Sequence, residues 1–278
     1  MKKRKAGKII FHVVMIFLAL LSIFPFIWTI SASFKTTGQL YNESPLKLIP
    51  KPFIVENYKR TWELLPFTSF LRNSLFISMI VPSLMILLSS MAAYAFAKLR
   101  FKGKNIIFML ILATMMLPSH VTLIPNYSIV RMLHWIDKYV AIMIPPLFTG
   151  INAFNIFFFR QYFLSIPKEL EDAAIIDGCS RFKLFFTIIM PNSKPAIATV
   201  GILSFRSIWN SFLWPSIVLN TYDKMTLTVG LKYFQGVVSN WGELLAGTTV
   251  ALIPVLVVFL IFQKYFIQTS MDSGFGGK

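Results

Sequence analysis

Residues 167–191 read Pro-Lys-Glu-Leu-Glu-Asp-Ala-Ala-Ile-Ile-Asp-Gly-Cys-Ser-Arg-Phe-Lys-Leu-Phe-Phe-Thr-Ile-Ile-Met-Pro, and long apolar runs flank this polar stretch on both sides. Ser165 and Pro167 are typical of a helix start, because serine accepts hydrogen bonds from free amides and proline fits the first turn. Gly178 suits the positive φ found at many helix ends. The stretch therefore predicts a short helix of roughly three turns that ends at Gly178.

One face of this predicted helix carries small and apolar residues. The positions i, i+3, i+4 and i+7 fall at Leu170, Ala173, Ala174 and Asp177. The two alanines would let the surface of another protein approach closely. From the periodicity alone, an ordinary amphipathic loop helix with a solvated acidic face is an equally good interpretation.

The rest of the chain is strongly apolar. Of its 278 residues 56% are hydrophobic, and the mean hydropathy is +0.67. Five charge-free stretches are each long enough to cross a bilayer as a helix, which takes about 20 residues; they are 9–34, 73–97, 105–130, 139–159 and 244–263. A sixth, 195–222, is interrupted only by Arg206. We therefore expect an all-α integral membrane protein with six transmembrane helices.

The apolar runs and the prolines predict where these helices begin and end. We expect helices at about 9–33, 71–97, 105–124, 139–160, 195–219 and 245–266. Prolines 118 and 125 should kink or stop the third helix, and Pro145-Pro146 should break the outer turn of the fourth. The chain then divides into an anchor helix with an outer segment (1–70), a five-helix core (71–266) and a cytoplasmic tail (267–278).

The distribution of charge predicts which side of the membrane each loop faces. The net charge is +16, and 16 of the 27 lysines and arginines lie in 1–8, 98–104, 160–194 and 264–278. These segments share one side of a six-helix chain, and their basic excess marks that side as cytoplasmic, with both termini. Such a pattern argues against nucleic acid as the partner. Met1–Lys5 and the apolar run after it also fit a secretory signal peptide, but the run is longer than such peptides have.

The sequence holds no sign of chemistry of its own. It lacks the Gly-x-x-x-x-Gly-Lys-Ser/Thr loop that binds ATP, and its eleven acids are scattered. No cluster of His, Cys and Asp predicts a metal site, and Cys179, the single cysteine, excludes an intrachain disulfide. We expect a chain that is not an enzyme and holds no cofactor; the resemblance described next implies that ATP and magnesium are bound by a separate partner.

The 167–191 stretch resembles the cytoplasmic signature loop of ATP-driven importer permeases. That pattern is Glu-Ala-Ala, three residues, Gly, nine residues, Ile, one residue, Leu-Pro. Asp172, Ala173 and Ala174 precede Gly178 at this spacing, and Ile188 and Pro191 follow it. The two departures, Asp172 for Glu and Met190 for Leu, are conservative.

Further stretches are similar to the maltose-permease-G-like half of the carbohydrate importers, within the family of binding-protein-dependent inner-membrane components. They are Ser31–Lys35, Glu56–Tyr58, Ala92–Phe101, Leu117–Pro125, Trp209–Pro215 and Gln263–Phe266. The resemblance implies a type I importer permease half of six helices in the bacterial cytoplasmic membrane. It pairs with a second homologous permease, and the translocation path runs between the halves.

The resemblance also implies partners and site residues. An ATP-binding subunit dimer would receive the loop 165–191 as a coupling helix. The implied coupling residues are Glu171, Asp172, Ala173, Ala174, Asp177, Gly178 and Pro191. An extracytoplasmic solute-binding protein would meet the outer loop 220–244, where the candidates are Phe234, Gln235, Asn240 and Trp241. These side chains can stack on and hydrogen-bond to sugars, although an aromatic anchor at the membrane interface explains them equally well.

Candidates for the solute path lie within the predicted fourth and fifth helices. Asn152 and Asn155 stand at i and i+3, and buried amides in lipid should face protein or a polar path. Trp209 and Asn210 occupy a spot typical of the family. Hydrogen bonding between helices and simple packing are the alternative interpretations for these two pairs.

Arg206 is the most unusual residue of the predicted spans. It follows Pro195 by 11 residues, which places it about 16 Å into the helix and near mid-bilayer, where a charge is costly. Related permeases often carry an apolar residue there, and an acid where this chain has Ser211. The pattern supports the hypothesis of an anionic sugar. Alternatively, Arg206 pairs with a carboxylate or carbonyl of the partner permease.

Other functions fit less well. Another small polar solute, such as a glycerophosphodiester, stays open. A secondary transporter would need a carboxylate inside the membrane, whereas the acids fall in predicted loops or at helix edges. A scaffold would not need the signature spacing.

Overall fold

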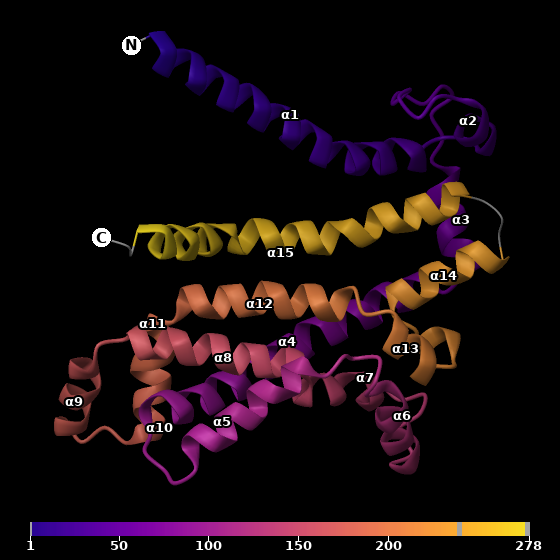
Figure 1. Ribbon diagram of the computed structural model, residues 1–278. Helices are drawn as coiled ribbons and strands as arrows, with labels where there is room; N and C mark the ends of the chain where they lie inside the picture. Colours follow the sequence, from indigo (N-terminus) through magenta and orange to yellow (C-terminus); the bar gives the residue numbers. More distant parts are fainter. Residues whose placement is uncertain (1, 238–240, 276–278) are drawn as a thin grey trace. The chain divides into compact units, whose positions relative to one another are not determined.

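The computed structural model describes the backbone of residues 2–237 and 241–275 and the side chains of 7–234 and 241–264. Within these ranges the chain is helical and has no strand (Figure 1), which confirms the predicted all-α class. Two compact units are present. Unit 1 comprises Met1–Thr68 with Gly230–Ile253, and unit 2 comprises Ser69–Val229 with Pro254–Lys278.

Unit 1 is built around side chains that link distant segments. Its helices are α1 (Lys2–Ser33), α2 (Thr37–Asn42), α3 (Glu56–Leu64) and the first part of α15 (Trp241–Phe275). The amide of Asn57 donates to the carbonyls of Ser33 and Lys35 at 2.8 and 2.9 Å, which holds α3 to the end of α1. The Thr61 hydroxyl donates to the Glu243 carbonyl at 3.1 Å and ties α3 to α15.

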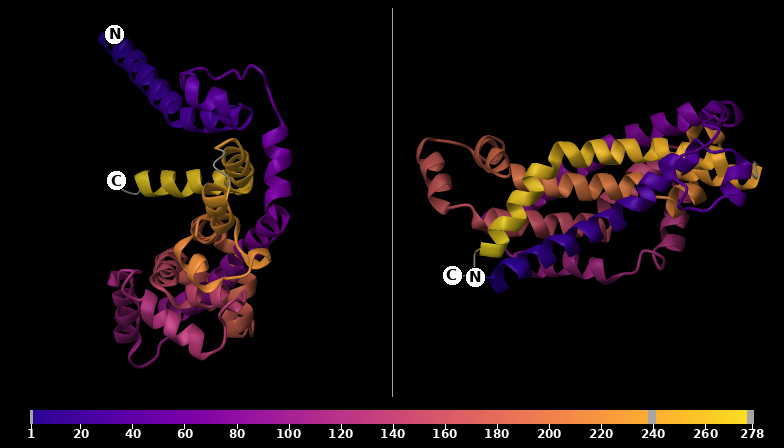
Figure 2. Two further views of the ribbon diagram at one scale, coloured as in Figure 1. Left: turned by 90° about the vertical axis from the view of Figure 1, so that its right-hand side faces the viewer. Right: turned by 90° about the horizontal axis from the view of Figure 1, so that it is seen from above.

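Unit 2 contains most of the remaining helices. They are α4 (Phe67–Lys98), α5 (Lys104–Ala113), η1 (Thr114–Met116), α6 (Leu123–Met132), α7 (Val140–Met143), η2 (Pro145–Phe148), α8 (Gly150–Ser165), α9 (Lys168–Ile176), α10 (Arg181–Leu184), η3 (Phe185–Ile189), α11 (Met190–Asn192), α12 (Lys194–Trp209), α13 (Leu213–Val218) and η4 (Tyr222–Lys224). Helix α14 (Leu227–Val237) begins in unit 2 and continues in unit 1 from Gly230. Helices α8 and α12 lie side by side, and α5 lies beside α8 (Figures 1 and 2). Helix α9 lies at one end of the unit and α6 at the other (Figure 1).

Helix α4 contributes to two apolar cores of unit 2. Ala93 and Tyr94 pack in the first core with residues of α8, α9, η3 and α12, among them Phe159 and Phe163. The second core surrounds Val81 and Met85 and draws on α6, α7 and α13; its other buried members are Ile77, Val130, Ala141, Ile142, Leu147, Val218 and Leu219. One continuous helix thus joins the packing at α9 to the packing at the opposite end of the unit.

The predicted transmembrane segments are all helical, but not all are single helices. Among the described residues, three helices are long and apolar enough to span a membrane, namely Gly7–Ser33, Phe67–Lys98 and Trp241–Lys264. A fourth span is possible as the pair Val140–Phe148 and Gly150–Ser165, bent by 48°. The predicted break at Pro145-Pro146 is confirmed, because α7 ends at Met143 and a short 3-10 helix, η2, begins at Pro145.

Two of the predicted helices are shorter than expected. The prediction of one helix over 105–124 is wrong, because α5 and η1 end at Met116, just before Pro118. The prediction over 195–219 is also wrong: α12 ends at Trp209, and α13 forms only six residues. Arg206 consequently lies in the last turn of α12, where the free carbonyls of the helix end favour a cation, rather than in the middle of a long helix.

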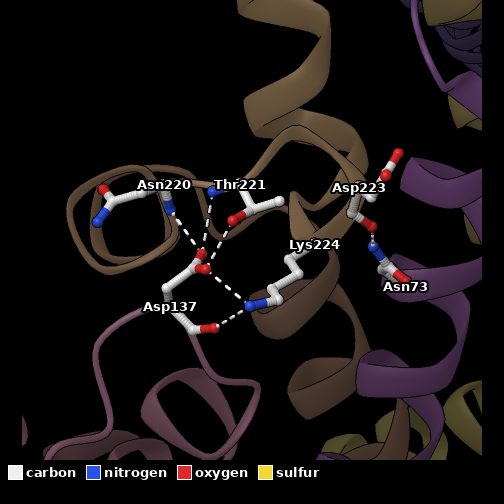
Figure 3. A network of polar contacts seen from close by, with 6 residues as sticks. All are labelled: Asn73, Asp137, Asn220, Thr221, Asp223 and Lys224. Carbon is white, nitrogen blue, oxygen red and sulfur yellow. Dashed lines mark hydrogen bonds and ion pairs between the residues drawn. The ribbon is translucent and has the colours of Figure 1, made fainter.

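A polar network around Asp137 fixes the segment before α7 to the segment 218–224 (Figure 3). The Asp137 carboxylate accepts hydrogen bonds from the Asn220 and Thr221 amides at 2.9 and 3.0 Å and from the Thr221 hydroxyl at 2.6 Å. The Lys224 ammonium donates to Asp137 Oδ2 at 2.7 Å and also to the Asp137 backbone carbonyl. Partial burial raises the pKa of Asp137, but these hydrogen bonds outweigh it and hold the pKa well below its usual range.

We predict that Asp137→Asn lowers the free energy of unfolding by about 1.5–3 kcal/mol at neutral pH, the contribution typical of hydrogen bonds to a charged group. Asparagine keeps the positive φ of 59° at this position, so the change tests the charge. Because the folded pKa is depressed, the stabilisation is present above the ordinary value of about 4 and is lost as the pH falls below it. Thermal unfolding in detergent between pH 7 and pH 3 measures both effects.

The matched control is Asp223→Asn, since Asp223 contributes its carbonyl, not its carboxylate, to the bond with Asn73. Equal unfolding temperatures for wild type and Asp137→Asn at pH 7 would contradict the prediction.

Candidate coupling site and solute cavities

Helix α9 forms where the sequence predicts it. Pro167 precedes the helix in an extended conformation, and Glu169 and Glu171 occupy its first turn, where the helix dipole favours acids. Gly178 has a φ of +76°, as predicted, and the amides of Gly178 and Cys179 donate to the carbonyls of Ile175 and Ala174. A Cβ on Gly178 would meet nothing within 4 Å. The glycine is therefore needed for backbone conformation and not for space.

The two faces of α9 have different environments. Glu171 and Ala174 are buried, and Ala174 belongs to the first apolar core of unit 2 with Ile166 and Leu184. The expectation that both alanines face a partner protein is therefore wrong for Ala174, because the core takes up this side of the helix. The outward face carries Leu170, Asp172, Ala173, Ile176 and Asp177. Ile176 is 85% exposed.

Glu171 is the buried acid of this site. Its carboxylate lies 2.6 Å from the Lys98 ammonium, as an ion pair without the alignment of a hydrogen bond. Its second oxygen lies 3.9 Å from Arg181. Glu171 thus contacts its own chain and holds α9 in place, and its predicted role in coupling stays a prediction.

Pro191 follows a widened helical turn in the segment after α9. Ser180 caps α10 by accepting a hydrogen bond from the Lys183 amide. The helix then widens into a π-helix at η3, where the Met190 amide donates to the Phe185 carbonyl. Proline cannot donate a backbone hydrogen bond and clashes with the preceding turn of a regular α-helix. Pro191 is exposed and lies in α11.

The two asparagines of the predicted path are buried and donate hydrogen bonds within unit 2. Asn152 is buried and donates to the Leu147 carbonyl at 2.7 Å. Asn155 is buried and donates to the Ser204 hydroxyl at 3.1 Å, which links α8 to α12. The Asn155 contact supports the alternative interpretation of hydrogen bonding between helices, whereas the Asn152 bond is local and leaves the buried Oδ1 of Asn152 without a partner among the described residues.

The other path candidates differ in burial. Trp209 is buried and stacks on Phe205 with ring centroids 5.7 Å apart, so it acts in packing. Arg206 and Asn210 are exposed at the end of α12. In the described part of the chain no carboxylate forms an ion pair with Arg206.

The predicted surface for a binding protein is only partly supported. Phe234 is fully buried and packs edge-on against Phe67 with centroids 6.4 Å apart, so the expectation that it reaches outward is wrong. Trp241 is exposed. The Gln235 side chain and Asn240 lie outside the described residues.

Two adjoining cavities occur where the third and fourth predicted helices break. Their volumes are about 890 and 310 Å³. The polar residues that line both cavities are Ser119, Thr122, Asn126 and Thr149. The smaller cavity is also lined by His120, Ser207, Ser211 and Trp214. The lining is mostly apolar, with several hydroxyls, the Asn126 amide and aromatic rings, and it has no Asp, Glu, Lys or Arg. The sequence interpretation missed these residues, although the prolines that break the helices pointed to them.

The chain is similar to known transport proteins over almost its whole length. Residues 85–270 match the family described as "Binding-protein-dependent transport system inner membrane component". The chain is 36% identical to the arabinooligosaccharides transport system permease protein AraQ of Halalkalibacterium halodurans, over 99% of this chain and 100% of that protein. It is 30% identical to the sn-glycerol-3-phosphate transport system permease protein UgpE of Yersinia pestis, over 98% and 99%.

A solved structure has the same fold. It is the crystal structure of a bacterial ABC transporter involved in the import of the acidic polysaccharide alginate. A chain of that transporter superimposes with a TM-score of 0.82 at 26% identity, covering 96% of this chain and 98% of that one.

We predict that Gly178→Val destabilises the end of α9 by about 1–2 kcal/mol, the cost of a left-handed conformation for a residue with a side chain. Gly178→Asn is the control, because asparagine tolerates this conformation. Hydrogen exchange should show faster exchange of the 177–179 amides in the valine variant alone. Equal protection in both variants would show that the positive φ is not required.

Proposed function

Because the chain belongs to the family of binding-protein-dependent transport system inner membrane components, we propose that it forms half of the path of an ATP-driven sugar importer and docks on the ATPase through α9. The chain is a bacterial inner-membrane permease subunit. Its family implies a second permease, an ATP-binding subunit and a solute-binding protein. In this proposal ATP and magnesium bind to the ATPase.

The outward face of α9 is the observation that carries the docking proposal. Leu170 and Ile176 are exposed apolar side chains on a polar loop outside the predicted spans, and Ala173 between them is small. Exposed apolar residues around a small one suit close contact with another protein. The opposite face of α9 is anchored in unit 2 through Ala174 and Glu171.

The coupling follows as a shift between two conformations. Closure of the ATPase dimer would move α9, and the membrane helices would pass from inward-open to outward-open because ATP favours the second state. This geometry requires α9 to lie on the cytoplasmic side. With an even number of spans both termini lie on that side as well, in agreement with the basic segments.

We predict that Ala173→Glu prevents recovery of the ATPase with the purified permease, because a charged side chain would be buried in the docking contact. Met132→Glu is the control, since Met132 is an exposed apolar residue of α6 at the other end of unit 2. Affinity purification from membranes measures the recovered ATPase. Full recovery with Ala173→Glu would contradict docking through this face.

The cavities support a polyhydroxylated solute. Hydroxyl and amide groups can exchange hydrogen bonds with sugar hydroxyls, and Trp214 and Phe148 offer apolar faces for sugar rings. The lining carries no Asp, Glu, Lys or Arg. A neutral oligosaccharide, the class named for AraQ, fits this lining best.

An anionic solute is the second candidate, because of Arg206. This exposed cation is next to Ser207, which lines the smaller cavity. The alginate importer and UgpE are named for acidic solutes. Guanidinium groups bind carboxylates and phosphates well, so Arg206 would attract a uronic acid or a phosphate ester.

We predict that the reconstituted complex takes up neutral oligosaccharides with ATP and that Arg206→Leu changes this uptake by less than about twofold, since a charge outside the cavity lining contributes little. Arg131→Leu is the control, because Arg131 is another exposed arginine in a last helical turn. Uptake of labelled neutral and acidic sugars separates the candidates. Uptake of acidic sugars alone, abolished by Arg206→Leu, would establish the second candidate instead.

A further inference from the structure

Lys98 holds α9 at two points. Its ammonium lies 2.6 Å from the Glu171 carboxylate in the middle of α9, and it donates a hydrogen bond at 2.9 Å to the Ile166 carbonyl just before the helix. Both charged side chains are nearly buried, with 10% of Lys98 and 4% of Glu171 exposed. One cation at the end of α4 therefore fixes both the entry and the body of α9.

The end of α4 is itself held by cations from two other helices. Arg160 of α8 donates to the Phe96 carbonyl at 3.2 Å, and its guanidinium lies over the Phe108 ring at 4.5 Å. Lys104 of α5 donates to the Leu99 carbonyl at 2.9 Å. These bonds satisfy carbonyls that a helix end leaves free. The position from which Lys98 reaches α9 is therefore well fixed.

A buried ion pair resists sliding in a way that apolar contact does not. Separating Lys98 from Glu171 would leave two buried charges without a partner, which is strongly unfavourable. Ala174 and Ile166 also pack against this unit, but their displacement would leave no charge without a partner. Arg181, which is exposed, lies 3.9 Å from the second Glu171 oxygen and adds attraction without burial.

Helix α4 continues from this ion pair to the cavities. Val81 and Met85 of α4 pack in the second core with Val130, and Val130 lines the larger cavity. Trp214, which lines the smaller cavity, packs against the same core. A displacement of α9 that is passed to α4 therefore reaches residues around both cavities.

We propose that the Lys98–Glu171 ion pair is the link that makes α9 and α4 move as one body, so that both residues are positioning residues for energy coupling. This inference rests on the proposed function, in which α9 receives the motion of the ATPase. It assigns the transmission to one buried pair behind the docking face and not to the docking residues themselves.

The first test compares transport with ATP hydrolysis in the reconstituted complex. Lys98→Met/Glu171→Leu replaces both charges by apolar groups, so that no unpaired charge stays buried. If the ion pair links α9 to α4, the double variant should transport about tenfold less solute per ATP hydrolysed, a typical coupling effect. Lys98→Arg, which keeps the charge, should leave this ratio near wild type. A purely structural role would lower both rates and leave the ratio unchanged, which would overturn the proposal.

The control is Lys59→Met/Glu63→Leu, which removes an exposed ion pair of α3 and should leave the ratio unchanged. If it lowers the ratio as much, the effect is not specific to the buried pair and the proposal fails.

The second test does not depend on the folding of a variant at the ion pair. Spin labels at Arg100 and Lys168, both exposed, report the distance between the end of α4 and α9 in a Cys179→Ser chain within the complex. The link predicts the same distance without nucleotide and with ATP bound. A change of about 5 Å, one helical turn, would overturn it. Absence of ATP-dependent uptake by the wild type would instead refute the proposed function.

Discussion

Lipid offers no hydrogen-bond partners to the backbone, and this constraint governs the whole chain. Every amide and carbonyl in the membrane must be satisfied within the protein, so the spans are helical and breaks occur only where protein or a polar cavity surrounds them. The breaks near Pro118 and Pro145-Pro146 coincide with the cavities lined by Ser119, Thr122 and Thr149. At the end of α4 the carbonyls of Phe96 and Leu99 are satisfied by cationic side chains.

The same constraint separates what the sequence can predict from what it cannot. Apolar length and charge locate the helices, and a glycine followed by polar residues locates the end of α9, because these signals are local. The direction in which a side chain points depends on packing between distant segments. Ala173 and Ala174 are neighbours with the same chemistry, yet only Ala174 enters the core, since α4, α8 and α12 meet on that side.

The misplaced predictions have the same physical origin. Phe234 looks like an outer contact in the sequence, but Phe67 covers it. Arg206 looks like a charge in the middle of a long helix, but α12 ends three residues later and its carbonyls favour the cation. Asn152 and Asn155 are polar residues in an apolar run, and their amide NH2 groups donate to the Leu147 carbonyl and the Ser204 hydroxyl. In each case the environment of the side chain depends on contacts or helix ends that the local sequence pattern does not reveal.

The proposed coupling depends on contact between the outward face of α9 and the ATPase. Cysteine cross-linking in a Cys179→Ser chain tests it directly, with single cysteines at Ile176, Ala173 and the buried Ala174 as control. Cross-links to the ATPase are expected from Ile176 and Ala173 but not from Ala174. Absence of cross-links from both outward positions, or equal cross-linking from Ala174, would contradict it.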